Sequence, residues 1–289
     1  LFGEKFHCWK KKGHGTVNMR SAIKRSCDVY FYEVARRLGV DRLSETAKNF
    51  GLGKRVLRDF AEERSGVVPS TTWKKKYIGQ NWYLGETLHS GIGQGYYQST
   101  PIQHCLMTAQ IANGGFEIKP RIIFDKEKNN LKEYLKFKNE NPDQPLPQDL
   151  LVSNFDLKPL FKNQENIKII KDAMYSSTNE PGGTSYRSRL EDTRFTFAGK
   201  TGSSQIKRFT ESQREAEVKQ ESLDYKDRDH ALFIAYAPVK DPKYAISVVV
   251  EHGGSGSKAA APIAKQVIKK VLERDALRNS ANDLIGDPV

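Results

Sequence analysis

The chain has 289 residues, of which 37% are hydrophobic and 28% charged, and its formal net charge is +12. This composition is polar for a globular domain but is not typical of a disordered chain, and the length is sufficient for one large domain with a full core. No apolar run approaches the roughly 18 residues of a membrane span, and no signal-peptide pattern follows Leu1. We therefore expect a fragment of a longer protein, with any export signal or membrane anchor upstream.

The basic charge favours an anionic partner such as nucleic acid, a membrane surface or an acidic polymer. The lysines are nevertheless spread along the chain, with short runs only at residues 10–12 and 74–76. A repeated finger, an aromatic platform or a basic helix would support a zinc-binding nucleic-acid module, and the sequence has none of these patterns. We therefore interpret the charge as a solvated basic surface and expect no specific nucleic-acid partner.

Helical patterns alternate with turn-rich stretches along the chain. Apolar spacing and capping residues predict helices at residues 29–38, 41–51, 100–114, 166–175 and 259–273. In the second of these helices Asp41 is the expected cap, and in the third Thr100 precedes Pro101 at the first helical position. Residues 52–98 are rich in Gly, Trp and Tyr with little periodicity, and this predicts loops and short turns.

The strand patterns lie in the second half of the chain. Residues 194–199 predict a strand that runs into Lys200, and residues 231–237 and 244–251 predict a hairpin. Helices, then strands, then a terminal helix predict an α/β protein of the α+β type, with an antiparallel sheet covered by helices on both faces. Charged or Pro-rich composition predicts surface insertions at about 125–150 and 207–229. We expect one domain over residues 1–276 and a carboxyl-terminal tail over 277–289.

The strand at Lys200 carries a Lys-Thr-Gly triplet, a mark of penicillin-recognising serine enzymes when it lies on a strand. Acyl transfer by serine requires a nucleophile, a proton shuttle, an oxyanion hole and a grip on the substrate. Lys200 supplies a cation and Thr201 a hydroxyl for a substrate carboxylate, and the backbone N–H of Ser203 is a candidate oxyanion donor. A Lys-Thr-Gly triplet alone, however, occurs by chance in many chains.

A second mark, Ser-x-Asn, is matched loosely by Ser26 and Asp28 with Cys27 between them. Ser26 at a helix start is a candidate proton relay, and Asp28 is a candidate for orienting amide or amino groups of a substrate. The alternative is that Ser26 is a plain N-cap. The two motifs occur in the expected order, about 170 residues apart, and this favours a shared site.

The third mark is a nucleophilic Ser-x-x-Lys. Ser21 and Lys24 match it, but the match ends two residues before Ser26, too close to form a separate corner of the same site. We interpret it as a coincidence within a helix. The nucleophile is then expected upstream of Leu1, and the chain alone is expected to be inactive.

Cys8, His14 and Cys27 form a Cys-x5-His-x12-Cys pattern. Thiolate and imidazole are the preferred ligands of zinc, and structural zinc takes four ligands. The pattern predicts a structural Zn2+ that clamps the loop presenting Ser26 and Asp28. The alternative is a buried Cys27 and an unrelated Cys8 thiol.

Several segments resemble the penicillin-binding protein 2 family, the elongation-specific class B transpeptidases of bacterial cell walls. These segments are residues 9–15 (WKKKGHG), 26–32 (SCDVYFY), 61–66 (AEERSG), 91–96 (GIGQGY), 100–103 (TPIQ), 200–205 (KTGSSQ) and 251–254 (EHGG). The resemblance extends over roughly residues 4–273.

The resemblance implies a serine D,D-peptidase/β-lactamase-like fold with a five-stranded antiparallel sheet between helical layers. It implies D,D-transpeptidation of peptidoglycan stem peptides ending in D-Ala-D-Ala, and β-lactam antibiotics as acylating mimics. The implied partners are a RodA-like SEDS glycosyltransferase and the scaffold of the rod complex. The implied location is the bacterial inner membrane with the domain in the periplasm. The fourth zinc ligand is implied to lie upstream of Leu1.

Two other functions stay open from the sequence. A division-specific class B transpeptidase shares the serine motifs, but the Cys/His pattern favours the elongation type. A catalytically silent penicillin-sensing or scaffold domain is compatible with the missing nucleophile.

Overall fold

The computed structural model describes residues 5–57, 60–120, 140–141, 158–207 and 218–284, with the backbone alone for residues 278–284. The insertion expected at 125–150 lies almost entirely outside these ranges. So does the part of the second expected insertion from residue 208 to residue 217.

The described residues form one antiparallel sheet of three strands, in the order β1-β2-β3. The strands are β1 (Ala198–Ser204), β2 (His230–Ala237) and β3 (Tyr244–Val250). These are the three strands that the sequence pattern located, whereas the family resemblance implied five. The first strand begins later than predicted, because residues Thr193–Phe195 form the 3-10 turn η3. Asp192 caps that turn by accepting a hydrogen bond from the backbone N–H of Arg194.

The helices are α1 (Met19–Arg25), α2 (Asp28–Leu38), α3 (Val40–Asn49), α4 (Thr71–Tyr77), α5 (Leu84–Gly91), α6 (Pro101–Ala112), α9 (Glu165–Asn179) and α11 (Ala261–Leu284). Shorter helical turns are η2 (Tyr186–Ser188), η4 (Gln220–Ser222), η5 (Tyr225–Asp227) and the π-helical turn η6 (Gly256–Ala260). The prediction of loops over 52–98 was wrong at α4 and α5. These helices have only 7 and 8 residues, too few for an apolar periodicity to show in the sequence.

Helix ends differ from the expectations in two places. Gly39, rather than Asp41, is the N-cap of α3, and the carboxylate of Asp41 instead accepts hydrogen bonds from Thr71. Helix α11 continues to Leu284, beyond residue 276, where we expected the tail to begin. The cap of α6 is as predicted: Thr100 and Gln103 exchange side-chain-to-backbone hydrogen bonds in a capping box.

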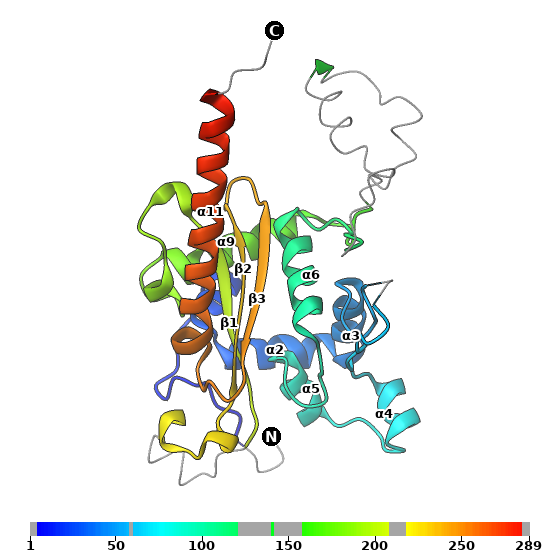
Figure 1. The fold of residues 1–289 in the computed structure, drawn as a ribbon. Coiled ribbons are helices and arrows are strands. Elements are labelled where there is room, and N and C mark those ends of the chain that lie inside the picture. The colour runs from blue at the N-terminus through cyan, green and yellow to red at the C-terminus, as the bar shows by residue number, and fades with distance from the viewer. Residues whose placement is uncertain (1–4, 58–59, 121–139, 142–157, 208–217, 285–289) are drawn as a thin grey trace.

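The sheet lies between two helical layers (Figure 1). One face packs against α11, and this core includes the buried residues Phe197, Ala231, Phe233, Ala264, Ile268 and Leu272. The other face packs against α6 and α9, through Ile111, Ala112, Ile167, Met174, Ala198 and Tyr236. Because side chains alternate along β2, neighbouring residues of that strand belong to different cores. This arrangement confirms the predicted sheet with helices on both faces.

Helix α1 is tied to α9 by ion pairs. Arg20 binds Asp172 and Glu180, and Lys24 also binds Glu180 with 2.8 Å between Nζ and Oε2. Helix α9 in turn packs against β1. The end of α1, where Ser26 lies, is therefore held beside the strand that carries Lys200.

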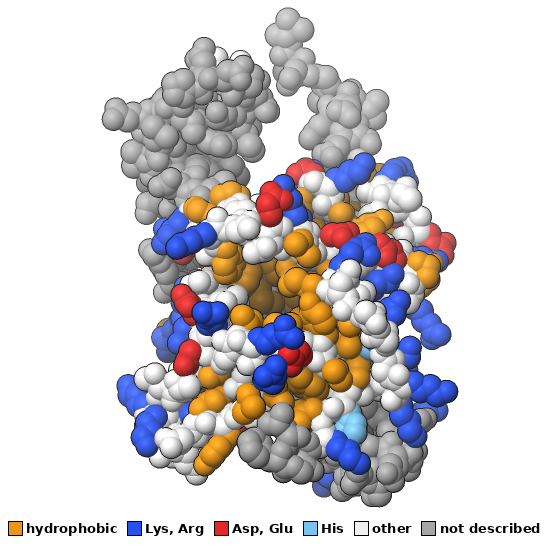
Figure 2. Space-filling view, turned by 180° about the vertical axis from the view of Figure 1, so that it is seen from behind, with side chains coloured by type: hydrophobic (Ala, Val, Ile, Leu, Met, Phe, Trp, Pro, Cys, Tyr) orange, Lys and Arg blue, Asp and Glu red, His pale blue; other side chains and the backbone are white. Residues whose placement is uncertain are grey.

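Basic side chains are scattered over the face shown in Figure 2, around a hollow lined with hydrophobic side chains. Acidic side chains lie among them on the same face. On this face the distribution agrees with a solvated basic surface rather than one concentrated binding patch. Within the described ranges, no helix combines the length and hydrophobicity that crossing a bilayer requires.

Candidate active site and metal centre

The two motifs that the sequence placed about 170 residues apart meet in the structure. The ammonium of Lys200 donates a hydrogen bond to the hydroxyl oxygen of Ser26, with 2.5 Å between Nζ and Oγ, across 174 residues of sequence. It also donates to the carbonyl oxygen of Thr201 at 2.8 Å. Lys200 lies near the middle of β1, paired with Ile234 of β2. A cation on a rigid strand therefore points at the junction between α1 and α2.

Ser26 has an uncommon backbone conformation. It ends α1 in the left-handed region, with a φ of 52°, which residues with a Cβ adopt at an energetic cost. The N-cap of α2 is Cys27, without a side-chain cap. Ser26 is therefore not the plain N-cap of the alternative interpretation, and its hydroxyl is directed to Lys200 instead. Strain of this kind is concentrated at functional sites.

Desolvation dominates the electrostatics of this pair. Loss of hydration around the ammonium lowers the pKa of Lys200 to about 8, although the carboxylate of Asp28 opposes this shift. Burial likewise raises the pKa of Asp28, against a hydrogen bond from the backbone N–H of Trp9 and the charge of Lys200. Because the ordinary pKa of lysine is 10.5, Lys200 gains and loses its proton much closer to neutral pH than a solvated lysine does.

The other predicted site residues of β1, Thr201 and Ser203, follow Lys200 along the strand. The hydroxyl of Thr201 donates to that of Thr184, with 3.0 Å between the oxygens. Ser203 lies two residues farther along the strand and is exposed. The backbone of Gly202 lies so close to Gly256 that a Cβ on Gly256 would meet the carbonyl oxygen of Gly202 at 2.5 Å.

Sequence reasoning missed the hydroxyl cluster beneath this strand. The Ser177 hydroxyl lies within hydrogen-bond distance of those of Thr184 and Ser185, and Thr178 accepts from the backbone N–H of Gly199 at 3.1 Å. The sequence does contain a signal for this cluster. Ser177 and Thr178 lie near the end of a helix, and Thr184 and Ser185 follow the next turn. These residues support β1 from the α9 side.

The Ser-x-x-Lys match at Ser21 and Lys24 has a structural explanation. Ser21 and Asn18 form the capping box at the start of α1, and Lys24 pairs with Glu180. Both side chains are therefore engaged in holding α1, which agrees with the interpretation of this match as a helical coincidence.

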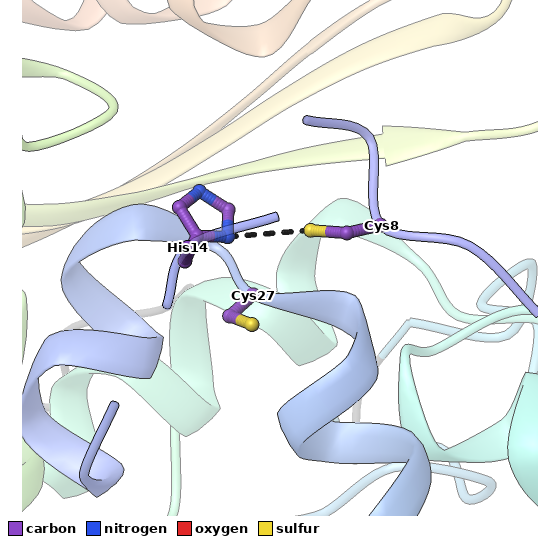
Figure 3. A group of neighbouring side chains, drawn as sticks. All are labelled: Cys8, His14 and Cys27. Carbon is purple, nitrogen blue, oxygen red and sulfur yellow. Dashed lines mark hydrogen bonds between the residues drawn. The ribbon is translucent and has the colours of Figure 1, made fainter. Parts of the chain in front are cut away.

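Cys8, His14 and Cys27 lie together beside this site, and their potential ligand atoms are all within 4.8 Å of one another. In Figure 3 the sulfur of Cys8 points at the ring of His14, with 3.3 Å between Sγ and Nδ1. Cys27 is buried at the start of α2. Desolvation lowers the pKa of His14, with further contributions from Lys10 and Arg25, and this favours the neutral ring that a metal ion requires. Two sulfurs and an imidazole at this spacing fit three sites of a tetrahedral zinc centre.

Residues 2–269 match the family model of the penicillin binding protein transpeptidase domain. The chain therefore belongs to this family, and its fold is that of this class of serine enzymes. Among curated relatives it is similar to the peptidoglycan D,D-transpeptidase MrdA of Salmonella typhimurium, with 32% identity over 93% of this chain and 40% of the relative. MrdA of Haemophilus influenzae is 34% identical over 94% of this chain and 39% of its own length.

The chain is also similar to solved structures of PBP2 proteins. Helicobacter pylori PBP2 in its complex with MreC has a TM-score of 0.73 and 30% identity, and the match covers 94% of this chain and 43% of that one. Pseudomonas aeruginosa PBP2 in complex with WCK 5153 has a TM-score of 0.71 and 35% identity, over 92% and 50% of the two chains. The chain thus spans about 40% of the curated relatives and at most half of these two structures.

Proposed function

We propose that this chain is part of the transpeptidase domain of a peptidoglycan D,D-transpeptidase that cross-links stem peptides ending in D-Ala-D-Ala during cell elongation. The observation that carries the proposal is the hydrogen bond from Lys200 to Ser26, which joins two distant motifs into one site. The similarity to MrdA proteins over more than nine-tenths of this chain supports the same function.

The proposed reaction has two acyl-transfer steps. The hydroxyl oxygen of a serine upstream of Leu1 attacks the carbonyl carbon of the penultimate D-Ala, and the amide bond to the terminal D-Ala breaks. The proton of the serine hydroxyl reaches the departing amine, so that D-Ala leaves. The amino group of a neighbouring stem peptide then attacks the carbonyl carbon of the ester, the bond to the serine oxygen breaks, and a proton from the attacking amine reaches that oxygen. β-Lactam antibiotics acylate the same serine by opening of their ring amide.

The residues of this chain have distinct proposed roles in these steps. Ser26, in contact with Lys200, relays the proton toward the leaving amine. The ammonium of Lys200 and the hydroxyl of Thr201 bind the substrate carboxylate, and the backbone N–H of Ser203 is the proposed oxyanion donor. The partly desolvated Asp28, at the start of α2, orients amide or amino groups of the substrate.

The carboxylate-binding role of Lys200 has a physical basis in its surroundings. Desolvation lowers the pKa of Lys200 to about 8, so the side chain is still largely protonated at neutral pH. An ammonium with little water around it attracts an anion more strongly than a solvated one does.

We also propose that Cys8, His14 and Cys27 hold a structural zinc ion, with a fourth ligand upstream. When bound, the ion contributes no catalytic group and joins the segment before α1 to the start of α2. This proposal rests on the clustering of their ligand atoms. A zinc ion at this place stabilises the loop between α1 and α2, and with it the position of Ser26.

Two similar structures support the proposal that this protein acts within a larger assembly. The H. pylori PBP2 structure is a complex with MreC, and another similar structure is that of a peptidoglycan synthase complex. We propose an MreC-like rod-complex scaffold and a RodA-like glycosyltransferase as partners, with the domain in the periplasm and an inner-membrane anchor upstream. The silent-domain and division-type alternatives are less favoured, because MrdA and PBP2 proteins match more than nine-tenths of this chain.

The test is intact-mass spectrometry of the full-length gene product after incubation with benzylpenicillin. The proposal predicts one covalent adduct per molecule, on a serine of a Ser-x-x-Lys motif upstream of Leu1. A folded protein that forms no adduct would favour the silent penicillin-sensing or scaffold domain instead.

A further inference from the structure

Trp9 makes contacts with both candidate catalytic residues around Cys27. Its backbone N–H donates to a carboxylate oxygen of Asp28 at 2.9 Å. Its indole N–H donates to the carbonyl oxygen of Ser26 at 2.8 Å, and lies 3.2 Å from that of Arg25. One residue from the amino-terminal segment therefore binds the backbone of Ser26 and the side chain of Asp28.

The two carbonyl oxygens that face the indole belong to the end of a helix. Arg25 is the last residue of α1 and Ser26 is its C-cap. Carbonyl groups at this position have no partner inside the helix and need one from elsewhere. Because Ser26 has a φ of 52°, its carbonyl also follows a backbone turn that residues with a Cβ disfavour. The indole N–H gives this turn a fixed partner.

Packing does not explain the position of this side chain. Trp9 is 63% exposed, whereas tryptophans that serve the core bury most of their surface. Its ring lies 5.5 Å from that of His14, and Cys8 precedes it in the chain. The contribution of Trp9 to this region is therefore concentrated in its N–H groups, which bind the carbonyl oxygens at the end of α1 and the carboxylate of Asp28.

We propose that Trp9 is a positioning residue for acyl transfer, which holds Ser26 in its left-handed conformation so that the hydroxyl stays within reach of Lys200. This inference rests on the proposed function for its catalytic consequence. Its structural part, the fixing of the Ser26 turn by the indole N–H, is independent of any activity.

The test compares Trp9→Phe with Trp82→Phe in the full-length gene product. Both substitutions keep an aromatic ring and remove one indole N–H donor, since Trp82 donates to the Thr87 hydroxyl at 2.8 Å. Stopped-flow kinetics with a fluorescent penicillin separate the non-covalent dissociation constant from the acylation rate constant. We expect Trp9→Phe to lower the acylation rate constant by about tenfold, the effect of one hydrogen bond. The dissociation constant should change by less than about twofold, and Trp82→Phe should leave both constants near those of the unsubstituted protein.

Amide hydrogen exchange of residues 22–28 supplies the readout that does not depend on activity. The proposal predicts faster exchange in Trp9→Phe, by about tenfold, and no change there in Trp82→Phe. Unchanged exchange in Trp9→Phe would overturn the positioning role. So would an equal loss of acylation in the two variants, or a loss confined to the dissociation constant. If the unsubstituted protein is not acylated, the proposed function fails, and the exchange result alone decides whether Trp9 positions Ser26.

Discussion

The ammonium of Lys200 lies 2.5 Å from the hydroxyl oxygen of Ser26, although 174 residues separate them in the sequence. Helix α9 supports both sides of this contact. Helix α1 is fixed to α9 through Arg20, Lys24 and Glu180, and α9 packs against the strand of Lys200. The site is therefore built around α9, which holds α1 through ion pairs and packs against the strand of Lys200.

Replacement of Ser26 by Ala removes the acceptor of the Lys200 hydrogen bond and the proposed proton relay. We expect Ser26→Ala to slow acylation of the full-length protein by β-lactams by roughly 10²–10⁴-fold, the range typical of a general acid–base group. The matched control is Ser21→Ala, which removes a hydroxyl that only caps α1. Slow acylation in Ser21→Ala with a rapid Ser26→Ala would instead identify Ser21 as the functional serine.

The left-handed backbone at Ser26 predicts that two substitutions of this residue differ in stability. Ser26→Gly lacks the same hydroxyl but adopts a φ of 52° without a steric penalty. We expect its free energy of unfolding to exceed that of Ser26→Ala by about 1 kcal/mol, while both variants acylate slowly. Urea unfolding of the two variants measures the difference. Equal stabilities would show that the backbone at this residue is not strained.

The pH dependence follows from the pKa of Lys200, which desolvation lowers to about 8. As the pH rises through about 8, Lys200 loses the proton that it donates to Ser26 and the charge that attracts a carboxylate. Acylation by a carboxylate-bearing β-lactam should therefore fall by about tenfold per pH unit above that value. Lys200→Arg stays charged and should lack this decline. A rate that rises through pH 8 and then stays constant would indicate that the neutral amine is the active form.

The free energy of unfolding is expected to change in the opposite direction to the acylation rate above pH 8. Between pH 8 and 10.5 the unfolded chain binds more protons at this lysine than the folded chain does. The free energy of unfolding should therefore rise with pH on account of Lys200. A fall in acylation above pH 8 would thus not come from unfolding caused by this group.

Removal of the proposed zinc ion should destabilise the loop that carries Ser26. We expect the full-length protein to bind one zinc ion, and chelation to lower its melting temperature and slow acylation. Cys8→Ser and Cys27→Ser should reduce the zinc content measured by elemental analysis. Cys105→Ser is the control, because Cys105 lies on α6 and contacts the carbonyl of Ala245. Full zinc content in both cluster variants would refute the proposed centre.

Sequence patterns predicted the elements with strong local signals. The Thr100 and Pro101 start of α6 and the hairpin of β2 and β3 are set by capping residues and by apolar runs. The site residues Ser26 and Lys200 were predicted from motif spacing, and the fold brings them into contact. Cys8, His14 and Cys27 were grouped from residue type and spacing, and they cluster in the structure.

Other features depend on contacts that no local pattern contains. The left-handed Ser26 is supported by Trp9, and Asp41 binds Thr71 instead of capping its own helix. The hydroxyls of Ser177 and Thr184 meet under β1 only after α9 packs on the sheet. These arrangements are tertiary, and sequence periodicity carries no information about them.

A double-mutant cycle on Ser26 and Lys200 tests the central claim most directly. Acylation rate constants would be measured for Ser26→Ala, Lys200→Met and the double variant in the full-length protein. If the two side chains act as one unit, the double variant should be slower than the slower single variant by less than about threefold. If the two effects multiply, Ser26 and Lys200 act independently, and the assignment of a shared acyl-transfer site is wrong.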